Sequence, residues 1–456
     1  MKLQVCILAA GQGKRMRSTK PKVLHEIASK ALVEHVLDTA KTLSPSESPI
    51  VIYGHGGEQL QAALSERDIT WVEQAEQLGT GHAVAQCLPS IENEGITLIL
   101  YGDVPLTRVD TLKELIEQAG KSGFGLLTVF MDDPTGYGRI VRNEQNEITA
   151  IVEHKDANAQ QLAITEVNTG IMAVKSESLH SWIPSLGNSN AQGEYYLTDC
   201  VEMAVNEGVE VRGVVAEDVY EVTGVNNRQQ LAELERAYQV SIAQTLMDSG
   251  VTLKDPARVD VRGELTCGQD VEIDINAVFS GKVSLGDGVK IGPNCVINDA
   301  HIAANTEVLA NCVIDSAQIG EGARIGPFAR VRPDTELGRN VHIGNFVEVK
   351  KSQISDGSKV NHLAYVGDSE IGRNVNVGAG TITCNYDGAF KHKTVLEDDV
   401  FIGSDTQLVA PVRVGRGSTV GAGTTVTADV EPDALVISRV KQKQISGWQR
   451  PKKPGK

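Results

Sequence analysis

The sequence predicts an α/β chain made of two differently built parts that are joined by a helix. Short apolar runs alternate with helical stretches up to about residue 225, and no Gly or Pro occurs between residues 226 and 249. A six-residue repeat fills most of the remainder. Alternation of strands and helices is typical of a mainly parallel sheet with helices on both faces. A hexapeptide repeat is typical of a parallel β-helix, whose stacked repeats bury a continuous core.

The first part contains four apolar runs that we expect to be buried strands. Three segments with helical spacing lie between or after them. Ligands of such sheets bind beyond the carboxyl ends of the strands, so the loops after Ala10 and Tyr101 are expected to carry function. The expected strands are 5–10, 49–53, 96–101 and 125–130, and the expected helices are 33–43, 81–88 and 111–119.

A single long helix is expected between the two parts. Asn227 with Gln230 forms a predicted N-terminal cap, and Gly250 ends the segment. The predicted linker helix covers residues 229–249. Its apolar residues at helical spacing are Leu231, Leu234, Tyr238, Ile242 and Leu246.

The repeat of the second part has an aliphatic residue first, Gly second and a small or β-branched residue fifth. We expect the aliphatic side chain to point inward, and the fifth residue to fill the space that remains. Residues 384–394 break the phase of the repeat, and an insertion of this kind is where binding residues tend to occur. The first positions are Leu285, Ile291, Ile319, Ile325, Leu337, Ile343, Ile371, Val414 and Val420.

Composition excludes several classes of function. The 456 residues carry a net charge of −16 and only 4% aromatic residues, which disfavours binding of nucleic acid. No apolar run approaches the length of a membrane span. The seven cysteines are scattered and form no C-x-x-C pair, which favours reduced thiols in a cytoplasmic protein.

Two loops of the first part carry candidate chemistry. Gly11 and Gly13 follow the first strand, where a Gly-rich turn lets backbone N–H groups approach a phosphate, and Arg15 and Lys22 add positive charge. Asp103 follows another buried strand, where a carboxylate is a natural Mg²⁺ ligand beside a triphosphate. An ordinary strand-to-helix turn and a turn aspartate remain alternatives for these two motifs.

Histidines are the candidate bases of the second part. Acyl transfer to an amine needs a base, and histidine changes its charge in the required pH range. His301, His342, His362 and His392 lie in the repeat region or its insertion. A histidine-ligated metal shared between subunits is the competing use of these residues.

Beyond these motifs, the whole chain resembles a known family. L-A-A-G-x-G, P-K, Q-A-E-Q-L-G-T-G-H, Y-G-D-V-P, G-Y-G-R, E-H-K-D, N-T-G and G-V-N-N occur in this order before the repeats. This pattern is similar to the bacterial bifunctional N-acetylglucosamine-1-phosphate uridylyltransferases and glucosamine-1-phosphate acetyltransferases. The resemblance implies an α/β Rossmann-like nucleotidyltransferase domain at 1–228, a linker helix at 229–249, and a left-handed parallel β-helix acetyltransferase domain with a C-terminal tail at 250–456. One position departs from the family pattern: Lys14 stands where a small hydroxyl residue is usual.

The resemblance implies two sets of site residues. Asp103 and Asn226 would bind Mg²⁺, and His362, in the stretch H-L-A-Y-V-G-D, would be the general base of acetyl transfer. UTP and the sugar nucleotide would contact Leu8, Ala9, Ala10, Gly11, Arg15, Lys22, Gln74, Gly79, Thr80, Tyr101, Gly102, Asp103, Gly138, Glu153, Asn168 and Asn226. Glucosamine 1-phosphate and acetyl-CoA would contact Arg332, Lys350, Tyr365, Asn376, Ala379, Asn385, Tyr386, Ser404, Ala422 and Arg439.

The resemblance also implies a cytoplasmic homotrimer that acetylates glucosamine 1-phosphate and then uridylylates the product. The output would be UDP-N-acetylglucosamine for envelope synthesis. One alternative is a monofunctional sugar-1-phosphate nucleotidyltransferase whose β-helix only oligomerises. Such a protein would not need His362, Arg332 or the Asn385-Tyr386 insertion. A second alternative is a non-catalytic regulatory subunit, which could dispense with the phosphate turn or Asp103.

Overall fold

In the computed structural model, residues 2–451 are described, and the end of the predicted C-terminal tail, 452–456, lies outside them. The chain divides into two compact units, Met1–Tyr238 and Gln239–Lys456. This division falls inside helix α9 (Arg228–Asp248), whereas the sequence places the domain limits at the two ends of that helix. The limits drawn from the sequence therefore stay a prediction.

The first unit is built on a mainly parallel sheet, as predicted, with strand order β11-β7-β10-β6-β1-β4-β5. Only β10 runs antiparallel to its neighbours along this path, and β8 and β9 form an antiparallel arm beside it. The strands are β1 (Leu3–Leu8), β4 (Ile50–Tyr53), β5 (Thr70–Glu73), β6 (Ile96–Tyr101), β7 (Phe124–Phe130), β8 (Arg139–Arg142), β9 (Ile148–Val152), β10 (Glu166–Lys175) and β11 (Val211–Val215); β2 (Glu26–Ile27) pairs with β3 (Lys30–Ala31) in a separate hairpin.

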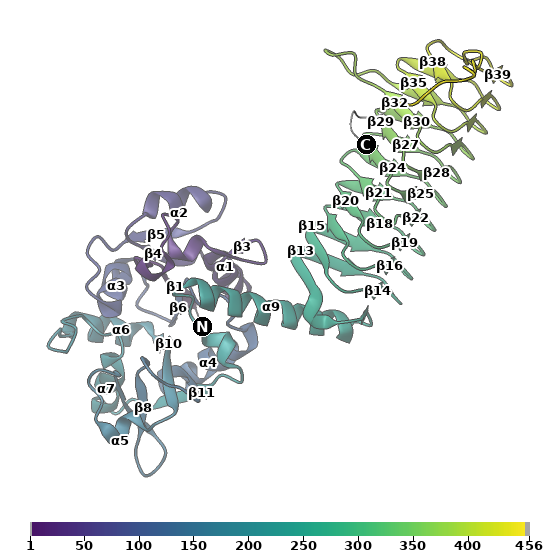
Figure 1. Cartoon of the computed structure of the whole chain (residues 1–456). Coiled ribbons are helices and arrows are strands. Elements are labelled where there is room, and N and C mark those ends of the chain that lie inside the picture. The colour runs from purple at the N-terminus through teal and green to yellow at the C-terminus, as the bar shows by residue number, and fades with distance from the viewer. Residues whose placement is uncertain (1, 452–456) are drawn as a thin grey trace. The chain divides into compact units, whose positions relative to one another are not determined.

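Helices cover both faces of this sheet (Figure 1). Alternate residues of a strand point to opposite faces, and along β1 Val5 and Ile7 join one core while Cys6 and Leu8 join the other. Helices α1 and α4 pack in the first core, and α3, α6 and α7 pack in the second. The helices are α1 (Leu32–Leu43), α2 (Gly57–Ala63), α3 (Thr80–Cys87), α4 (Val109–Ser122), α5 (Ala159–Leu162), α6 (Ser176–Trp182), α7 (Asp199–Asn206) and α8 (Val219–Val222), with short 3₁₀ turns at Lys14–Met16 and Lys22–Leu24.

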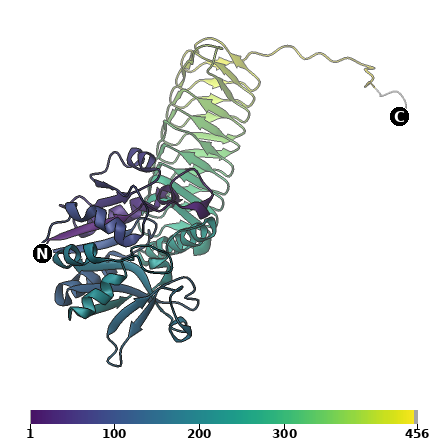
Figure 2. The same ribbon diagram turned by 90° about the vertical axis from the view of Figure 1, so that its left-hand side faces the viewer.

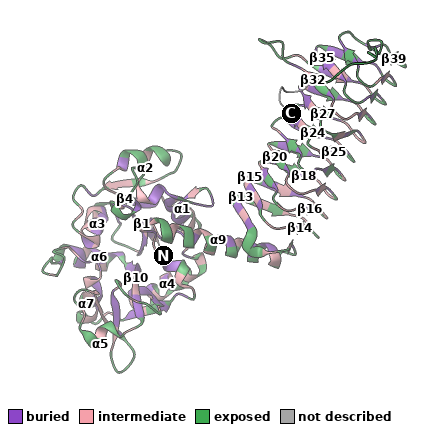
Figure 3. Cartoon of the chain, viewed as in Figure 1, coloured by how far each residue is buried: buried purple, intermediate pink, exposed green. Residues whose placement is uncertain are grey.

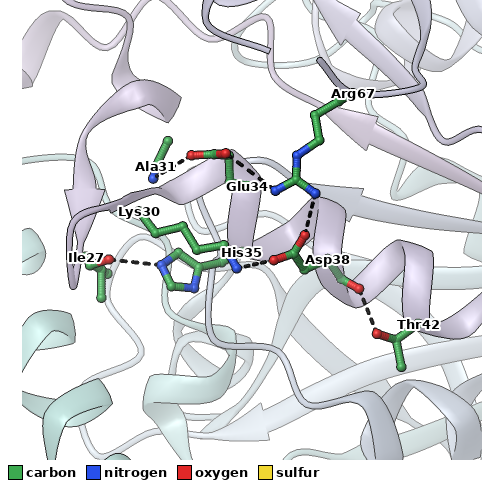
Figure 4. Close-up of polar contacts among 8 residues, drawn as sticks. All are labelled: Ile27, Lys30, Ala31, Glu34, His35, Asp38, Thr42 and Arg67. Carbon is green, nitrogen blue, oxygen red and sulfur yellow. Dashed lines mark hydrogen bonds and ion pairs between the residues drawn. The ribbon is translucent and has the colours of Figure 1, made fainter. Parts of the chain in front are cut away.

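A polar network stabilises the outer edge of α1 (Figure 4). Asp38 pairs with Lys30 and with Arg67, whose Nη1 lies 2.7 Å from Asp38 Oδ1. Arg67 also reaches Glu34 at 3.5 Å. His35, on the buried side of the same helix, contacts the carbonyl of Ile27 at 3.0 Å.

Helix α9 begins with the cap that the sequence predicts. Asn227 Oδ1 accepts the backbone N–H of Gln230 at 2.9 Å, and the Gln230 side chain accepts the backbone N–H of Asn226 at 2.9 Å. Leu234 packs in the core of the first unit, while Gln239 exchanges two hydrogen bonds with the backbone of Val261 in the second. The helix therefore contributes packing to both units.

Within residues 2–451, no helix combines the length and the apolar character that crossing a membrane requires.

The second unit is a β-helix whose short parallel strands stack coil upon coil (Figure 2). One column of 11 strands contains β12 (Thr252–Leu253), β14 (Glu272–Ile273), β16 (Lys290–Ile291), β19 (Glu307–Val308), β22 (Arg324–Ile325), β25 (His342–Asn345), β28 (Lys359–His362), β31 (Asn376–Val377), β34 (Phe401–Ile402), β37 (Thr419–Val420) and β39 (Leu435–Val436). The 17 strands of the other sheet are β13 (Val259–Cys267), β15 (Ala277–Leu285), β17 (Val296–Asn298), β18 (His301–Ile302), β20 (Val313–Asp315), β21 (Ala317–Ile319), β23 (Arg330–Val331), β24 (Thr335–Leu337), β26 (Glu348–Lys350), β27 (Gln353–Ile354), β29 (Tyr365–Gly367), β30 (Ser369–Ile371), β32 (Ile382–Cys384), β33 (Thr394–Leu396), β35 (Gln407–Val409), β36 (Val412–Val414) and β38 (Thr425–Val426).

The hexad pattern explains the core of this β-helix. All nine predicted first-position residues are at most 4% exposed, and Figure 3 shows buried residues recurring among exposed ones along the coils. Stacked partners such as Asn345 and His362 lie 17 residues apart, whereas Asn374 and Asp399 lie 25 residues apart across the insertion. The predicted break of phase is therefore confirmed as extra chain in one coil.

Candidate active sites

A cavity of about 360 Å³ opens in the first unit beyond the carboxyl ends of β1 and β6. The loops after these two strands, which the sequence singles out, both contribute to its wall. Its lining residues are Leu8, Ala9, Ala10, Gly11, Lys22, Val23, Gln74, Gln77, Gly79, Thr80, Ala83, Tyr101, Asp103 and Glu194.

Two glycines let the loops of this cavity pack closely. Gly13 has φ +58°, and a Cβ there would lie 2.8 Å from Cβ of Lys22. Gly79 has φ +114°, and a Cβ there would lie 2.5 Å from the carbonyl oxygen of Tyr195. Gly adopts such backbone conformations at no steric cost and has no Cβ to clash, so these positions let the first loop lie against Lys22 and the start of α3 lie against Tyr195.

Polar side chains on the β5–α3 side of the cavity are held rigidly. Gln74 is buried, and its amide donates to the carbonyl of Gly79 at 3.1 Å. Gln77 donates in turn to the carbonyl of Gln74 at 2.9 Å. Thr80, the first residue of α3, accepts the backbone N–H of Leu197 at 3.2 Å. This wall is therefore organised before any ligand arrives.

Lys22, Asp103 and Asn226 meet at the charged end of the site. The ammonium of Lys22 forms an ion pair with Asp103 and a 3.2 Å hydrogen bond with Asn226 Oδ1. The side chains of Lys22 and Asp103 are only 12% and 14% exposed. The two oxygens thus converge on one cation, and a carboxylate with an amide oxygen is a donor set that suits a hard cation such as Mg²⁺.

Tyr101 connects this cavity to a second group of predicted residues. Burial raises the pKa of Tyr101 well above its ordinary value, and the charges of Asp103 and Glu153 add to that effect. Burial likewise raises the pKa of Glu153, which accepts a hydrogen bond from Thr198 at 3.3 Å. Gly138 lies beside Glu153, where a Cβ would stand 3.4 Å from its carboxylate.

Asn168 belongs to the same group. Its backbone N–H donates to the carbonyl of Gly138 at 2.9 Å, and its side-chain oxygen accepts the N–H of Gly170 at 2.9 Å. Glu153 also lines a neighbouring cavity of about 500 Å³. Gly138, Glu153 and Asn168, which the resemblance assigns to the sugar, therefore lie together, next to the cavity of the first unit instead of in its wall.

Arg15 is the predicted residue that lies apart. It is exposed in the 3₁₀ turn Lys14–Met16 and does not line the cavity among the described residues. Conversely, Gln77 and Glu194 line the cavity without having been predicted. Gln77 lies in the Q-A-E-Q-L-G-T-G-H stretch, which could have indicated it, whereas nothing in the sequence around Glu194 does so.

A cluster of cations marks the outer surface of the second unit. Arg332 and Lys350 occupy corresponding positions in successive coils, and Arg332 pairs with Glu348 at 2.8 Å. Partial burial lowers the pKa of Lys350, and the neighbouring charge of Lys391 lowers it further. Lys391, which belongs to the insertion, is a member of this cluster that sequence reasoning missed.

His362 ends β28 on an exposed position of the coil. Its Nδ1 lies 3.0 Å from Oδ1 of Asn345, the residue directly below it in the stack. Asn376 follows in the next coil, paired with Lys359 of the His362 strand. Because an amide oxygen accepts from the ring, the contact with Asn345 orients the imidazole with its other nitrogen directed away.

The insertion holds its own polar residues in a compact turn. Asn385 donates to Asp368, whose own backbone N–H bonds the carbonyl of Lys350 at 3.1 Å. The hydroxyl of Tyr386 donates to the carbonyl of Gly388 at 2.6 Å, and Lys391 lies 5.4 Å from the centroid of the Tyr386 ring. The ring of Tyr365 packs against Gly367, close to the side chain of Asn385.

The remaining predicted residues line one corner of successive coils. The carbonyl of His362 accepts from Gly380, that of Ala379 accepts from Asp405, and that of Ser404 accepts from Gly423 at 2.8 Å. Ala422 packs beside Gly403, which directly follows β34, and Arg439 reaches Gly421, the corresponding glycine of the next coil. Ala379, Ser404, Ala422 and Arg439 thus form a row that starts next to His362.

The competing use of the histidines as metal ligands gains no support within one chain. Among residues 2–451, no group of three or more His, Cys, Asp and Glu side chains converges as metal ligands would. His301 contacts Ser284 at 2.6 Å, and His392 contacts Asp387 at 2.7 Å. Backbone N–H groups and His392 lower the pKa of Asp387 below its ordinary range.

Known families match both units. The MobA-like NTP transferase domain matches residues 5–158, and the bacterial transferase hexapeptide repeat matches residues 266–299 and 393–428. The GMPPB C-terminal domain matches residues 318–410. The matches agree with the two architectures that the structure contains.

Full-length relatives decide the family. Proteins named bifunctional protein GlmU from Nitrosospira multiformis and Marinobacter nauticus are each 59% identical to the chain, and one from Dechloromonas aromatica is 60% identical. Each alignment covers 99% of this chain and 99% of the relative. The chain belongs to the GlmU family.

Membership of the GlmU family confirms the resemblance and the fold class that the sequence predicts. It also confirms the bifunctional enzyme, a UDP-N-acetylglucosamine pyrophosphorylase and glucosamine-1-phosphate N-acetyltransferase. A solved UDP-glucose pyrophosphorylase aligns with 52% of the chain and 98% of its own length at TM-score 0.43 and 17% identity, which is too distant to add to this assignment.

Proposed function

We propose that the cavity of the first unit binds UTP, and that the group around Glu153 holds N-acetylglucosamine 1-phosphate. The observation that carries this is the convergence of Lys22, Asp103 and Asn226 at one end of a cavity lined by glycine-rich backbone. Gln74, Gly79 and Thr80 would recognise uracil, and the loop Leu8–Gly11 would approach the phosphates. Glu153, Asn168 and Gly138 would bind the sugar, next to Tyr101.

The first reaction is uridylyl transfer. An oxygen of the sugar 1-phosphate attacks the α-phosphorus of UTP, and pyrophosphate leaves. The nucleophile is already ionised near neutral pH, so the residues of this site position the reactants and offset charge, and no general base is needed. Asp103 and Asn226 would hold a Mg²⁺ ion, which would neutralise the charge that develops on the phosphates. Lys22, and Arg15 from the exposed turn, would contact the triphosphate.

The second unit would transfer the acetyl group of acetyl-CoA to the amine of glucosamine 1-phosphate. His362 would accept a proton from the amine as it attacks the thioester, with Asn345 fixing the ring. Arg332 and Lys350 would bind the sugar phosphate, with Lys391 beside them. Tyr365, Asn376, Asn385 and Tyr386 would enclose the sugar and the acyl group. The row Ala379, Ser404, Ala422 and Arg439 would contact coenzyme A.

We infer that acetyl transfer comes first and that its product is the acceptor for uridylyl transfer. The exposed residues of the β-helix around His362 leave room for neighbouring copies of the chain, and we propose a homotrimer assembled through the β-helices. All seven cysteines are free thiols, which suits the cytoplasm, where UTP and acetyl-CoA are available.

Family membership already disfavours the alternative that the sequence left open, a monofunctional nucleotidyltransferase whose β-helix only oligomerises. The cation cluster Arg332, Lys350 and Lys391 argues against it, because assembly alone gives no reason to gather three like charges on one part of the coils. Incubating the purified chain with acetyl-CoA, glucosamine 1-phosphate and UTP tests both activities together. Free thiol and pyrophosphate should both appear; either product alone would show that one unit has been misinterpreted.

A further inference from the structure

Lys22 binds the two oxygens that are assigned to the metal. Its ammonium contacts the carboxylate of Asp103 and lies 3.2 Å from Oδ1 of Asn226. Both members of the ion pair are largely shielded from water, at 12% and 14% exposure. A divalent cation that uses these oxygens would therefore have to displace the ammonium, because two cations cannot share the same pair of ligands at contact distance.

A second position for the displaced Lys22 ammonium lies within the same cavity. Lys22 Nζ faces the open side of Gly11, where a Cβ would stand 4.0 Å from it, and both residues line the nucleotide cavity. A small movement along the cavity wall takes Nζ from Asp103 toward the space in front of the Leu8–Gly11 loop. In the proposed function this space receives the phosphates of UTP, which are strong partners for a lysine ammonium.

We propose that Lys22 is an internal counter-ion that occupies the metal position of the free enzyme and is transferred to the phosphates when UTP and the divalent cation bind together. Each charged group keeps a partner of opposite charge during the exchange, because Asp103 binds the metal when Lys22 binds the phosphates. It rests on the assignment of this cavity to UTP. Its consequence is that metal and nucleotide bind with strong positive coupling, while the metal alone binds weakly.

The test measures binding of Mn²⁺ alone, by electron paramagnetic resonance of the free ion, to the full-length protein without nucleotide. We expect the Lys22→Met variant to bind Mn²⁺ about tenfold more tightly than the unmodified protein, a typical size for coupling between two binding events. Equal or weaker binding by Lys22→Met would overturn the proposal, because a lysine that merely positions Asp103 would aid the metal instead of competing with it.

Three control variants distinguish displacement of the Lys22 ammonium by the metal from a general effect of removing positive charge near the site. Lys14→Met removes the same charge from the neighbouring exposed turn, and we expect no change in Mn²⁺ affinity; tightening equal to that of Lys22→Met would contradict the proposal. Lys22→Arg keeps the cation and should keep weak binding. Adding Asp103→Asn to Lys22→Met should abolish the increase in Mn²⁺ affinity that Lys22→Met produces. If the increase persists, the metal binds elsewhere and the proposal fails. Thermal unfolding of each variant checks that the first unit is folded.

A second measurement concerns the coupling itself. With the non-hydrolysable α,β-methylene analogue of UTP, the unmodified protein should bind Mn²⁺ much more tightly than without it, and Lys22→Met should lose most of this enhancement. Equal enhancement in both proteins would overturn the exchange. None of these readouts requires turnover, so they are independent of the pyrophosphate assay. Absence of pyrophosphate would count against the proposed function alone, and absence of the Lys22→Met effect against the exchange alone.

Discussion

The two candidate sites are built in opposite ways. In the first unit, loop backbone forms much of the cavity wall, and the charged side chains are largely shielded from water and already paired, as Lys22 is with Asp103. In the second unit, exposed side chains such as His362 stand on the outside of rigid coils, and the cations gather next to one another. The first site therefore depends on charges that must exchange partners, and the second on side chains that are held at fixed positions by the stacking.

Asp103→Asn is the variant with the largest expected difference between the two sites. The variant removes the only carboxylate of the converging pair and leaves Lys22 without its partner, so uridylyl transfer should fall about 10³-fold. Pyrophosphate release measures the effect. Acetyl transfer, measured as free thiol in the same preparation, should be unchanged because the substitution touches one unit only.

A matched control for this substitution is Asp110→Asn on α4. Asp110 also pairs with a lysine, Lys113, but its side chain is almost fully exposed. We expect both activities of this variant to equal those of the unmodified chain. Uridylyl transfer that survives Asp103→Asn at the unmodified rate with Mg²⁺ would remove Asp103 from the site.

The corresponding substitution in the second unit is His362→Ala. Loss of a general base typically costs about 10²-fold, so acetyl transfer should fall by that factor while pyrophosphate release is unchanged. Asn345→Ala removes the 3.0 Å contact that orients the ring and should give a smaller loss of acetyl transfer than His362→Ala.

Local patterns in the sequence were enough to predict the fold class and the loops that form the cavity of the first unit. Inward hexad positions, the Asn227 cap and the strand-end loops depend on neighbours in sequence, and each is found where it was expected. Glu194 and Lys391 could not be found in this way. Glu194 reaches the cavity through the pairing of Tyr195 with Leu78, a contact between segments far apart in the chain.

For Arg15, the local sequence pattern does not determine where the side chain lies. Its charge and its place after the Gly-rich turn suggested a phosphate contact, yet Lys22 lines the cavity and Arg15 is exposed. Both follow the same turn, and only the backbone path through Gly13 and the 3₁₀ turn decides which one points inward. Composition and spacing do not contain that information.

Gly79→Ala tests how strongly the site of the first unit depends on the conformation of its loop backbone. A Cβ would stand 2.5 Å from the carbonyl oxygen of Tyr195, so the loop must shift away from α3, and KM for UTP should rise about tenfold. Gly208→Ala is the matched control, because it shares a positive φ, +76°, but has open space around its Cβ position. It should reduce stability slightly and leave KM unchanged; an equal rise of KM in both variants would show that strain alone is responsible.

The smallest effect is expected at Asp38, an ion pair of the first unit that lies outside the site (Figure 4). Partial burial would raise the pKa of Asp38, but Lys30 and Arg67 together lower it below its ordinary value. The side chain is 41% exposed, so after screening by water Asp38→Asn should cost about 0.5 kcal/mol of stability at pH 7.

The effect of Asp38 on stability should depend on pH. A carboxylate whose pKa is lowered by folding stabilises the protein above its unfolded pKa of about 3.9 and loses that effect as the pH falls through its folded pKa. The difference in Tm between the two proteins should therefore vanish in that acid range. A Tm difference that stays constant down to that range would mean that packing, and not charge, holds this edge of α1. Charge would then matter only where it is largely shielded from water, as at Lys22 and Asp103.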